Sequence, residues 1–306
     1  MGICAIPALN TASAFSAGKT NFAIKYNQET IQYKTFGIYV LPGERVDIEI
    51  TEASSNGSYG FLASAGNTMR KGNNKWQWQV PGEKGDYTLI ITDPSSIDSM
   101  ILNVFVMVPY DRIDGEYLNG YRIGTYPDKP LRNLEIYERP EGFVEVTEDN
   151  QNTYIAPHFQ LRQFLCKQNG DFPKYLVLRE RLLLKLEIVL EKANNAGYEC
   201  ETFHVMSGYR TPYYNEMLKD VRYSRHIYGG AADIFIDIDP EDGMMDDLNE
   251  DGKINLADAD VLYDIIDDMY GKPWYELYVG GLGKYGCTEC HGPFVHIDAR
   301  GFRARW

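Results

Sequence analysis

The pattern of hydrophobic residues changes near residue 110, and this change constrains the fold more than any other feature. From about Lys19 to Pro109, apolar and polar residues alternate in short runs that Gly and Pro separate. Alternation with a period of two is typical of half-buried strands, and frequent turn residues indicate hairpins. We expect strands at Val46–Ile50, Trp76–Val80, Tyr87–Ile91 and Met100–Val108. Residues 19–110 are therefore predicted to form an all-β sandwich.

Beyond Asp111 the spacing becomes helical. One helix is predicted from apolar residues at helical spacing, namely Leu182, Leu183, Leu186, Val189, Leu190 and Ala193. Another is predicted to begin at Thr211-Pro212, a capping residue followed by proline. Strands are expected at Thr202–Met206 and at Ala232–Ile238, where Ile234, Ile236 and Ile238 would face the core. The fold class is thus multidomain, with the sandwich followed by an α+β domain over residues 111–306.

The charge of the chain is uneven and excludes some partners. The 306 residues carry 30 Lys+Arg and 44 Asp+Glu, which gives a net charge of −14. Nucleic acids and anionic membrane surfaces are improbable partners, because binding them requires basic side chains. Thirteen of the acidic residues and a single lysine lie between Asp237 and Asp268. No apolar run is long enough for a membrane span, and we expect a monomer.

The first residues favour export. Residues 3–9 are apolar and precede the small residues Ala12-Ser13-Ala14, as in the core and cleavage site of a signal peptide. A basic region before the apolar run is missing, so residues 1–18 would be the remnant of a longer signal or a disordered N-terminus. Four further cysteines are compatible with an oxidising compartment. We therefore expect an exported protein, periplasmic or extracellular.

Three residues in the second half have the pattern of a metal site. His226 precedes Asp233 by a turn with two glycines, and Asp233 lies on a predicted strand. Near the end of the chain, His296 alternates with the apolar Val295 and Ile297 on another predicted strand. Two imidazoles and one carboxylate, with a fourth position left for water, form the ligand set of a catalytic zinc site.

Three blocks around these residues resemble the zinc D-Ala-D-Ala peptidase family of peptidoglycan carboxypeptidases and endopeptidases. They are residues 207–215 (SGYRTPYYN), 224–233 (SRHIYGGAAD) and 294–298 (FVHID). The resemblance implies an α+β fold shared with hedgehog-type domains, with zinc on His226, Asp233 and His296. It also implies hydrolysis of peptidoglycan stem peptides by zinc-activated water, as a D,D-carboxypeptidase or an endopeptidase. The alternative is a non-catalytic zinc- and calcium-containing module that binds cell wall or protein.

The same resemblance proposes roles for neighbouring residues. Arg210 would hold a terminal carboxylate or the developing oxyanion, or else form a structural salt bridge. Ser207 and Tyr214 would shape the substrate side of its turn. Many family members place an acid three residues before the last zinc histidine, or a histidine two before it, but this chain has Pro293 and Phe294 there. The candidate proton carriers are His291 and then Glu289, while Asp298 is as consistent with support of His296.

A second metal is predicted in the acidic segment. Residues 247–258 match a calcium loop, with Gly252 at its sixth position. The ligands would be Asp247, Asn249, Asp251, the Lys253 carbonyl and Asp258. The acid at the last position resembles dockerin loops, but dockerins carry two such repeats. A structural calcium site between the zinc ligands is therefore expected, rather than a cohesin-binding module.

The sequence Cys287-Thr288-Glu289-Cys290-His291 fits the attachment pattern of a c-type haem. A haem five residues from His296 would crowd the predicted zinc pocket. A local disulfide or a pair of free thiols is expected instead.

Overall fold

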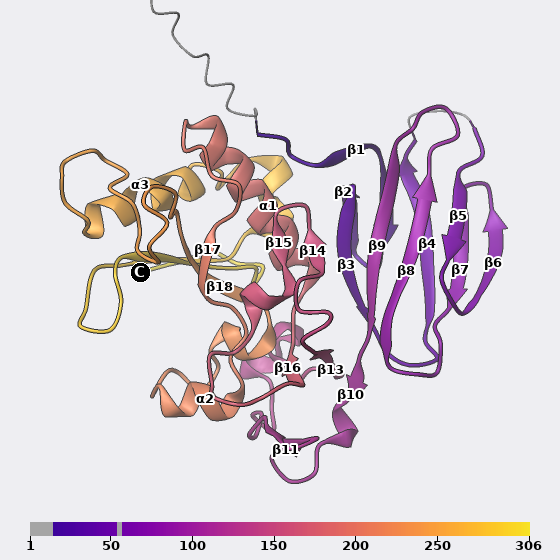
Figure 1. Ribbon diagram of the computed structural model, residues 1–306, viewed down its shortest axis with the longest axis horizontal. Coiled ribbons are helices and arrows are strands. Elements are labelled where there is room, and N and C mark those ends of the chain that lie inside the picture. The colour runs from indigo at the N-terminus through magenta and orange to yellow at the C-terminus, as the bar shows by residue number, and fades with distance from the viewer. Residues whose placement is uncertain (1–14, 54–56) are drawn as a thin grey trace, which may run out of the picture.

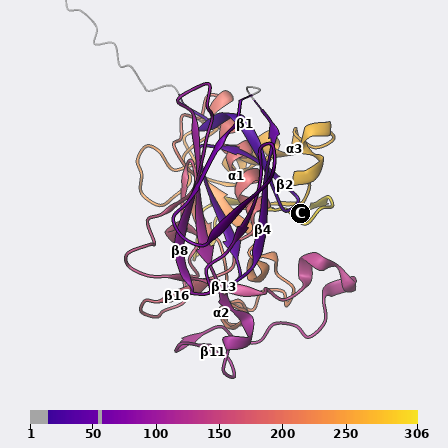
Figure 2. The same cartoon turned by 90° about the vertical axis from the view of Figure 1, so that its right-hand side faces the viewer.

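The computed structural model describes residues 15–53 and 57–306, so the predicted export segment lies largely outside the described residues. Strands β1 to β9 form one part of the molecule, and the later elements form the other (Figure 1). Seen from the side of the sandwich, these strands lie in front of helices α1 and α3 (Figure 2). The fold is β-rich, and the change of pattern near residue 110 separates its two parts.

The first part is a sandwich of two sheets within the described residues. One sheet has the order β2-β1-β4-β7-β6, with β1 Lys19–Tyr26, β2 Glu29–Tyr33, β4 Arg45–Glu52, β6 Asn67–Gly72 and β7 Lys75–Gln79. The other has the order β3-β9-β8-β5, with β3 Thr35–Val40, β5 Gly60–Ala63, β8 Gly85–Thr92 and β9 Ser99–Val106. The inward side chains of both sheets, including Ile48, Trp78, Leu89 and Leu102, form its core. The four strands predicted from alternation are confirmed as β4, β7, β8 and β9.

The second part is built around a five-stranded sheet with the order β17-β18-β20-β19-β21. Its strands are β17 His204–Ser207, β18 Ala231–Phe235, β19 Gly281–Tyr285, β20 Phe294–Asp298 and β21 Ala304–Arg305. The helices are α1 Glu180–Asn195, α2 Pro212–Met217 and α3 Leu256–Asp267. α1 buries the predicted leucine face, and the Thr211 side chain accepts a hydrogen bond from the Tyr214 N–H at the start of α2. Both predicted helices are therefore confirmed.

Short elements complete the second part. The strands are β10 Val108–Pro109, β11 Tyr117–Leu118, β12 Tyr121–Arg122, β13 Gly142–Val146, β14 Tyr154–Ala156, β15 Phe159–Gln160 and β16 Lys174–Leu176. The 3₁₀ turns are η1 Tyr110–Arg112, η2 Leu131–Asn133, η3 Glu135–Tyr137, η4 Leu161–Phe164, η5 Arg225–Tyr228 and η6 Pro273–Tyr278. Within the described ranges, no helix has the length and apolarity that a membrane span needs.

The sandwich is packed directly against the second part. One continuous cluster of buried apolar side chains runs through both. Ile155 of β14 lies against Gly37 of β3, where an added Cβ would come within 3.1 Å of the Ile155 side chain. Ion pairs cross the same boundary, including Arg181 with Glu29 at 2.7 Å. Apolar packing and polar contacts together fix the sandwich to the second part.

One strand prediction needs correction at its end. The strand expected over Ala232–Ile238 ends at Phe235, because the backbone of Ile236 and Ile238 bonds to Asp246 instead of to a neighbouring strand. Ile238 is therefore 41% exposed rather than part of the core. Phe235 is buried and stacks on the His204 ring at 4.4 Å between centroids.

Basic residues near the end of the chain neutralise part of the acidic segment. Helix α3 packs against β19, and Lys284 of β19 pairs with Asp260 of α3 at 2.5 Å. Asp267 pairs with Arg303 at 3.2 Å and with Arg305 at 2.7 Å. Some of the acidic excess therefore fastens α3 to the central sheet.

Candidate metal centre

The central sheet brings two of the predicted ligands together. In the antiparallel pairing of β18 with β20, Asp233 lies directly opposite His296. On the other side of His296, the register of β19 places Gly283, which has no side chain. Both strands are buried along their length, which fixes their register. The pairing of β18 with β20 therefore places this carboxylate and this imidazole side by side.

The third ligand comes from the short turn η5. His226 is buried in this turn, which ends at Gly229 in a left-handed conformation with φ 65°. The Gly229 N–H donates to the His226 carbonyl at 3.2 Å, and a Cβ at Gly229 would lie 2.4 Å from the Val177 carbonyl oxygen. The glycine lets the chain turn from η5 into β18, so that His226 faces Asp233.

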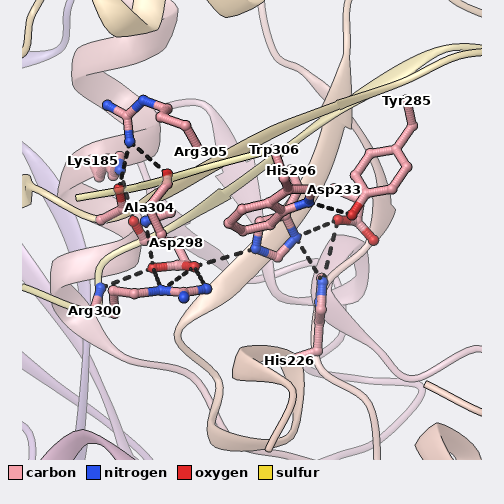
Figure 3. Close-up of polar contacts among 12 residues, drawn as sticks. Lys185, His226, Asp233, Tyr285, His296, Asp298, Arg300, Ala304, Arg305 and Trp306 are labelled. Carbon is pink, nitrogen blue, oxygen red and sulfur yellow. Dashed lines mark hydrogen bonds and ion pairs between the residues drawn. The ribbon is translucent and has the colours of Figure 1, made fainter. Parts of the chain in front are cut away.

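Three ligand atoms converge at this place. His226 Nε2 lies 3.2 Å from His296 Nδ1 and 3.3 Å from Asp233 Oδ1. His296 Nδ1 lies 2.8 Å from the same Asp233 oxygen (Figure 3). In the part of the chain that the structure describes, this is the one group of three or more His, Cys, Asp or Glu whose ligand atoms lie within 4.8 Å of one another. The group could hold a metal ion.

The other nitrogens of the two imidazoles have partners that fit metal binding. His226 Nδ1 lies 2.7 Å from the Gly208 carbonyl oxygen, which can only accept, so this nitrogen donates. His296 Nε2 lies 3.3 Å from Asp298 Oδ2 and can donate to it. Each ring then keeps a lone pair on the nitrogen that faces Asp233. Such outer partners orient ligating histidines and raise their basicity.

Without a metal, burial and the short distances between these groups shift their pKa values. Burial lowers the pKa of His226. Burial also acts to lower the pKa of His296, but hydrogen bonds and charges of Asp233 and Asp298 raise it to about 9. Burial opposes ionisation of Asp233, yet the two histidines hold its pKa well below the usual range. A bound metal ion would replace the proton that Asp233 and Asp298 favour on His296.

Asp298 anchors the group from behind. Its carboxylate is fully buried and accepts hydrogen bonds from the Arg300 side chain (Figure 3). It also accepts a hydrogen bond from the Gly281 N–H. Its backbone carbonyl accepts a hydrogen bond from Lys185 Nζ at 2.7 Å. Burial would raise the pKa of Asp298, but His296 and Arg300 hold it well below the usual range. Asp298 is therefore an anionic support for His296, as the strand pattern allowed.

Arg210 lies at the group, but its donors are already engaged. Its Nε donates to Ser207 Oγ at 2.8 Å, and its two terminal nitrogens pair with Asp220 at 2.7 Å and with Asp233 at 2.6 Å. Ser207 thus orients Arg210, as expected of a residue that shapes this turn. Tyr214 is held by its N–H at the start of α2 and is not among the residues that line the adjacent cavity.

A cavity of about 630 Å³ opens beside the three ligands. His226, Asp233, His296 and Arg210 line it, together with residues that the motifs did not indicate. These include Tyr285 and Trp306. The Trp306 ring packs on His296 with 5.2 Å between centroids, and its Nε1 donates to Tyr285 Oη at 2.5 Å. Their aromatic residue types are common in cores, so the sequence carried no signal for them.

The two predicted proton carriers lie elsewhere. His291 Nδ1 lies 2.8 Å from the Gly292 carbonyl oxygen, and its ring packs edge-on against Phe294. Glu289 is exposed, and neither residue is among those that line the cavity. Cys287 and Cys290 are exposed free thiols, and Cys166 and Cys200 are buried free thiols.

The acidic loop 247–258 folds as a compact turn. The Asp247 carboxylate accepts hydrogen bonds from the Asp251 and Gly252 N–H groups, at 3.1 and 2.7 Å. Asp258 is buried and caps α3, accepting hydrogen bonds from the N–H groups of Asn255 and Leu248. Among the described residues, its carboxylates do not gather within 4.8 Å as the histidine group does. Calcium binding at this loop stays a prediction.

Comparison with known proteins gives no further identification. No protein-family model matches the chain, and no curated protein matches it.

Proposed function

We propose that this protein is an exported zinc peptidase that hydrolyses peptide bonds of bacterial peptidoglycan. The observation that carries the proposal is the convergence of His226 Nε2, Asp233 Oδ1 and His296 Nδ1 at the wall of one cavity. Two nitrogens and one oxygen are a donor set that suits zinc and leaves a position for water. Zinc bound there would lower the pKa of a water molecule to about 7 and polarise a scissile carbonyl.

The chain's own residues would orient the peptide. Arg210 is fixed by Ser207 and by Asp233, while its third partner, Asp220, keeps 32% of its side chain exposed. A ligand carboxylate or a carbonyl oxygen could replace Asp220 on this nitrogen without disturbing the other two contacts. Arg210 would then bind the peptide as the resemblance implies.

Tyr285 is the better placed proton donor. Its oxygen accepts the Trp306 indole hydrogen, and an indole N–H can only donate. The phenol proton is therefore left for another acceptor, and Tyr285 lines the cavity that holds the metal group. Burial raises the pKa of Tyr285, and the charge of Asp233 adds to this effect, so the phenol stays protonated at neutral pH. A protonated phenol could donate to an oxygen or a leaving amine beside the metal group.

The second candidate function is a module that binds cell-wall peptide or protein without cleaving it. Two observations favour it. His291 and Glu289 do not line the cavity. Among the described residues, the only carboxylates that line the cavity are the metal ligand Asp233 and the paired Asp220, so no free carboxylate is present to act as a general base. Calcium at residues 247–258 would serve as a structural brace under either function.

Digestion of defined muropeptides followed by mass spectrometry tests the proposal. The zinc-loaded protein should carry one zinc per chain and cleave muropeptides, and His226→Ala should abolish both properties. His204→Ala is the matched control, because His204 stacks on Phe235 outside the ligand group. A zinc-replete protein that binds sacculi but leaves them and D-Ala-D-Ala peptides intact would establish the binding module instead.

A further inference from the structure

The cavity wall carries more positive than negative side chains, although the whole protein is strongly acidic. Four arginines line the cavity, namely Arg210, Arg222, Arg225 and Arg300, against the two aspartates Asp220 and Asp233. Arg210 is paired with both aspartates, and Arg300 is paired with Asp298 behind the cavity. Among the described residues, no carboxylate lies within 4.0 Å of the Arg222 or Arg225 guanidinium. The two arginines therefore leave positive charge unmatched beside the metal group.

Arg225 is the unusual member of this set. It is only 3% exposed, yet its Nε has no hydrogen-bond partner. Buried arginines normally have a carboxylate partner, because an unpaired buried charge is costly. An arginine side chain is not deprotonated in proteins, so this buried charge is present at neutral pH.

The guanidinium of Arg225 is held in a fixed orientation. It lies 4.9 Å from the centroid of the Tyr137 ring and 5.4 Å from that of Tyr228. One terminal nitrogen donates to the Ile136 carbonyl. These contacts leave Nε and the second terminal nitrogen without an acceptor. Nε itself is shielded from solvent, so a ligand in the cavity that Arg225 lines would reach the guanidinium at the second terminal nitrogen. A planar arginine fork is suited to carboxylate groups.

We propose that Arg225, with Arg222 and Arg300 beside it, forms a subsite for a free carboxylate of a peptide bound in the cavity. The peptide part of this inference rests on the proposed function, while the anion binding does not require hydrolysis. The carboxylate would supply the missing acceptor for Arg225 and offset the unmatched charge. Ligands for this cavity would then be acidic peptides rather than neutral ones.

Calorimetric titration of the full-length, metal-free protein tests the subsite apart from catalysis. The probes are N-acetyl-D-alanyl-D-glutamate and its uncharged diamide, with inorganic phosphate as a third arm. The acid should bind at least about tenfold more tightly than the diamide, because charge-assisted hydrogen bonds contribute that much. Arg225→Met should remove this difference by weakening binding of the acid alone. The exposed Arg162, outside the cavity lining, provides the matched control Arg162→Met.

Three results would overturn the proposal. They are equal affinity of the wild-type protein for acid and diamide, unchanged acid binding in a folded Arg225→Met variant, and tighter binding of phosphate than of the acid peptide. The comparison of acid with diamide uses only the wild-type protein, so equal affinity overturns the proposal even where the variant fails to fold. Selective acid binding without any cleavage by the zinc-loaded protein would support the subsite and reject the peptidase.

Discussion

Replacing Gly229 by alanine should destabilise the part of the chain that positions His226. Gly229 has φ 65°, a left-handed conformation that costs a non-glycine residue about 1–2 kcal/mol. The new Cβ would also lie 2.4 Å from the Val177 carbonyl oxygen and 2.8 Å from the Leu178 nitrogen. These are backbone atoms that no rotamer change can move, and relieving such overlap costs about 1–3 kcal/mol.

The two effects together predict a loss of about 2–5 kcal/mol in the free energy of unfolding. Gly271→Ala is the matched control, since Gly271 has φ 81° but no atom within 4 Å of an added Cβ. It should lose only the conformational part, about 1–2 kcal/mol. Urea unfolding with linear extrapolation measures both values.

The same substitution should also weaken metal binding, because the shift that relieves the overlap would move the turn that carries His226 and ends at Gly229. Zinc retained after dialysis should fall in Gly229→Ala and stay unchanged in Gly271→Ala. Equal losses of stability in the two variants would refute the steric argument, and full zinc retention by Gly229→Ala would refute the link to His226.

Three further predictions concern other parts of the molecule. Burial lowers the pKa of His158, but the hydrogen bond and charge of Glu187 raise it above 6.5 overall. With Glu187 ionised, the stabilisation that protonated His158 contributes is complete below pH 6.5 and is lost as pH rises through the raised value. Burial also raises the pKa of Glu187, so the pair is lost again at low pH, where this carboxyl is protonated. His158→Gln should flatten that part of the pH profile of the unfolding free energy, and an unchanged profile would count against the pair. Ile155→Ala should cost about 2–5 kcal/mol and leave one unfolding transition, whereas two separate transitions would show that the sandwich unfolds independently. Removing calcium from the loop 247–258 with EDTA should lower the melting temperature, and excess calcium should restore it. Asp247→Asn should abolish this response, and equal melting temperatures in EDTA and in calcium would contradict calcium binding.

The ligand group was predictable because its information is local. Asp233 and His296 each lie between two apolar residues of a short strand, and the His226 turn ends in glycine. These short motifs are also the ones that carry the family resemblance. By contrast, Tyr285 and Trp306 reach the cavity through the pairing of β19 with β20 and β21. Such long-range pairing leaves no periodic signal in the residues concerned.

Strand β3 illustrates the same limit in the sandwich. Five of its six residues are buried, so its sequence is nearly continuous in apolar residues and does not alternate. It pairs in parallel with β9 and also contacts β14 of the second part. A strand covered on both faces cannot be recognised from a period of two.

The acidic segment shows how a charge pattern admits two explanations. The sequence alone assigns part of its excess to a calcium loop over residues 247–258. The structure gives Asp260 and Asp267 basic partners from β19 and the end of the chain. These partners are distant in sequence, so a local count of charge could not include them.

The close packing of the sandwich on the second part sets the geometry of any two-site binding. Ile155 against Gly37 and the Arg181–Glu29 pair leave no free tether between the sandwich and the metal cavity. On a flexible linker, the effective concentration of a second binding event depends on linker length. Here the effective concentration would depend only on the fixed relative positions of the sandwich and the cavity. A polymer bound to the sandwich would meet the cavity in a single orientation. A ligand too short to span both sites would gain no affinity from the sandwich.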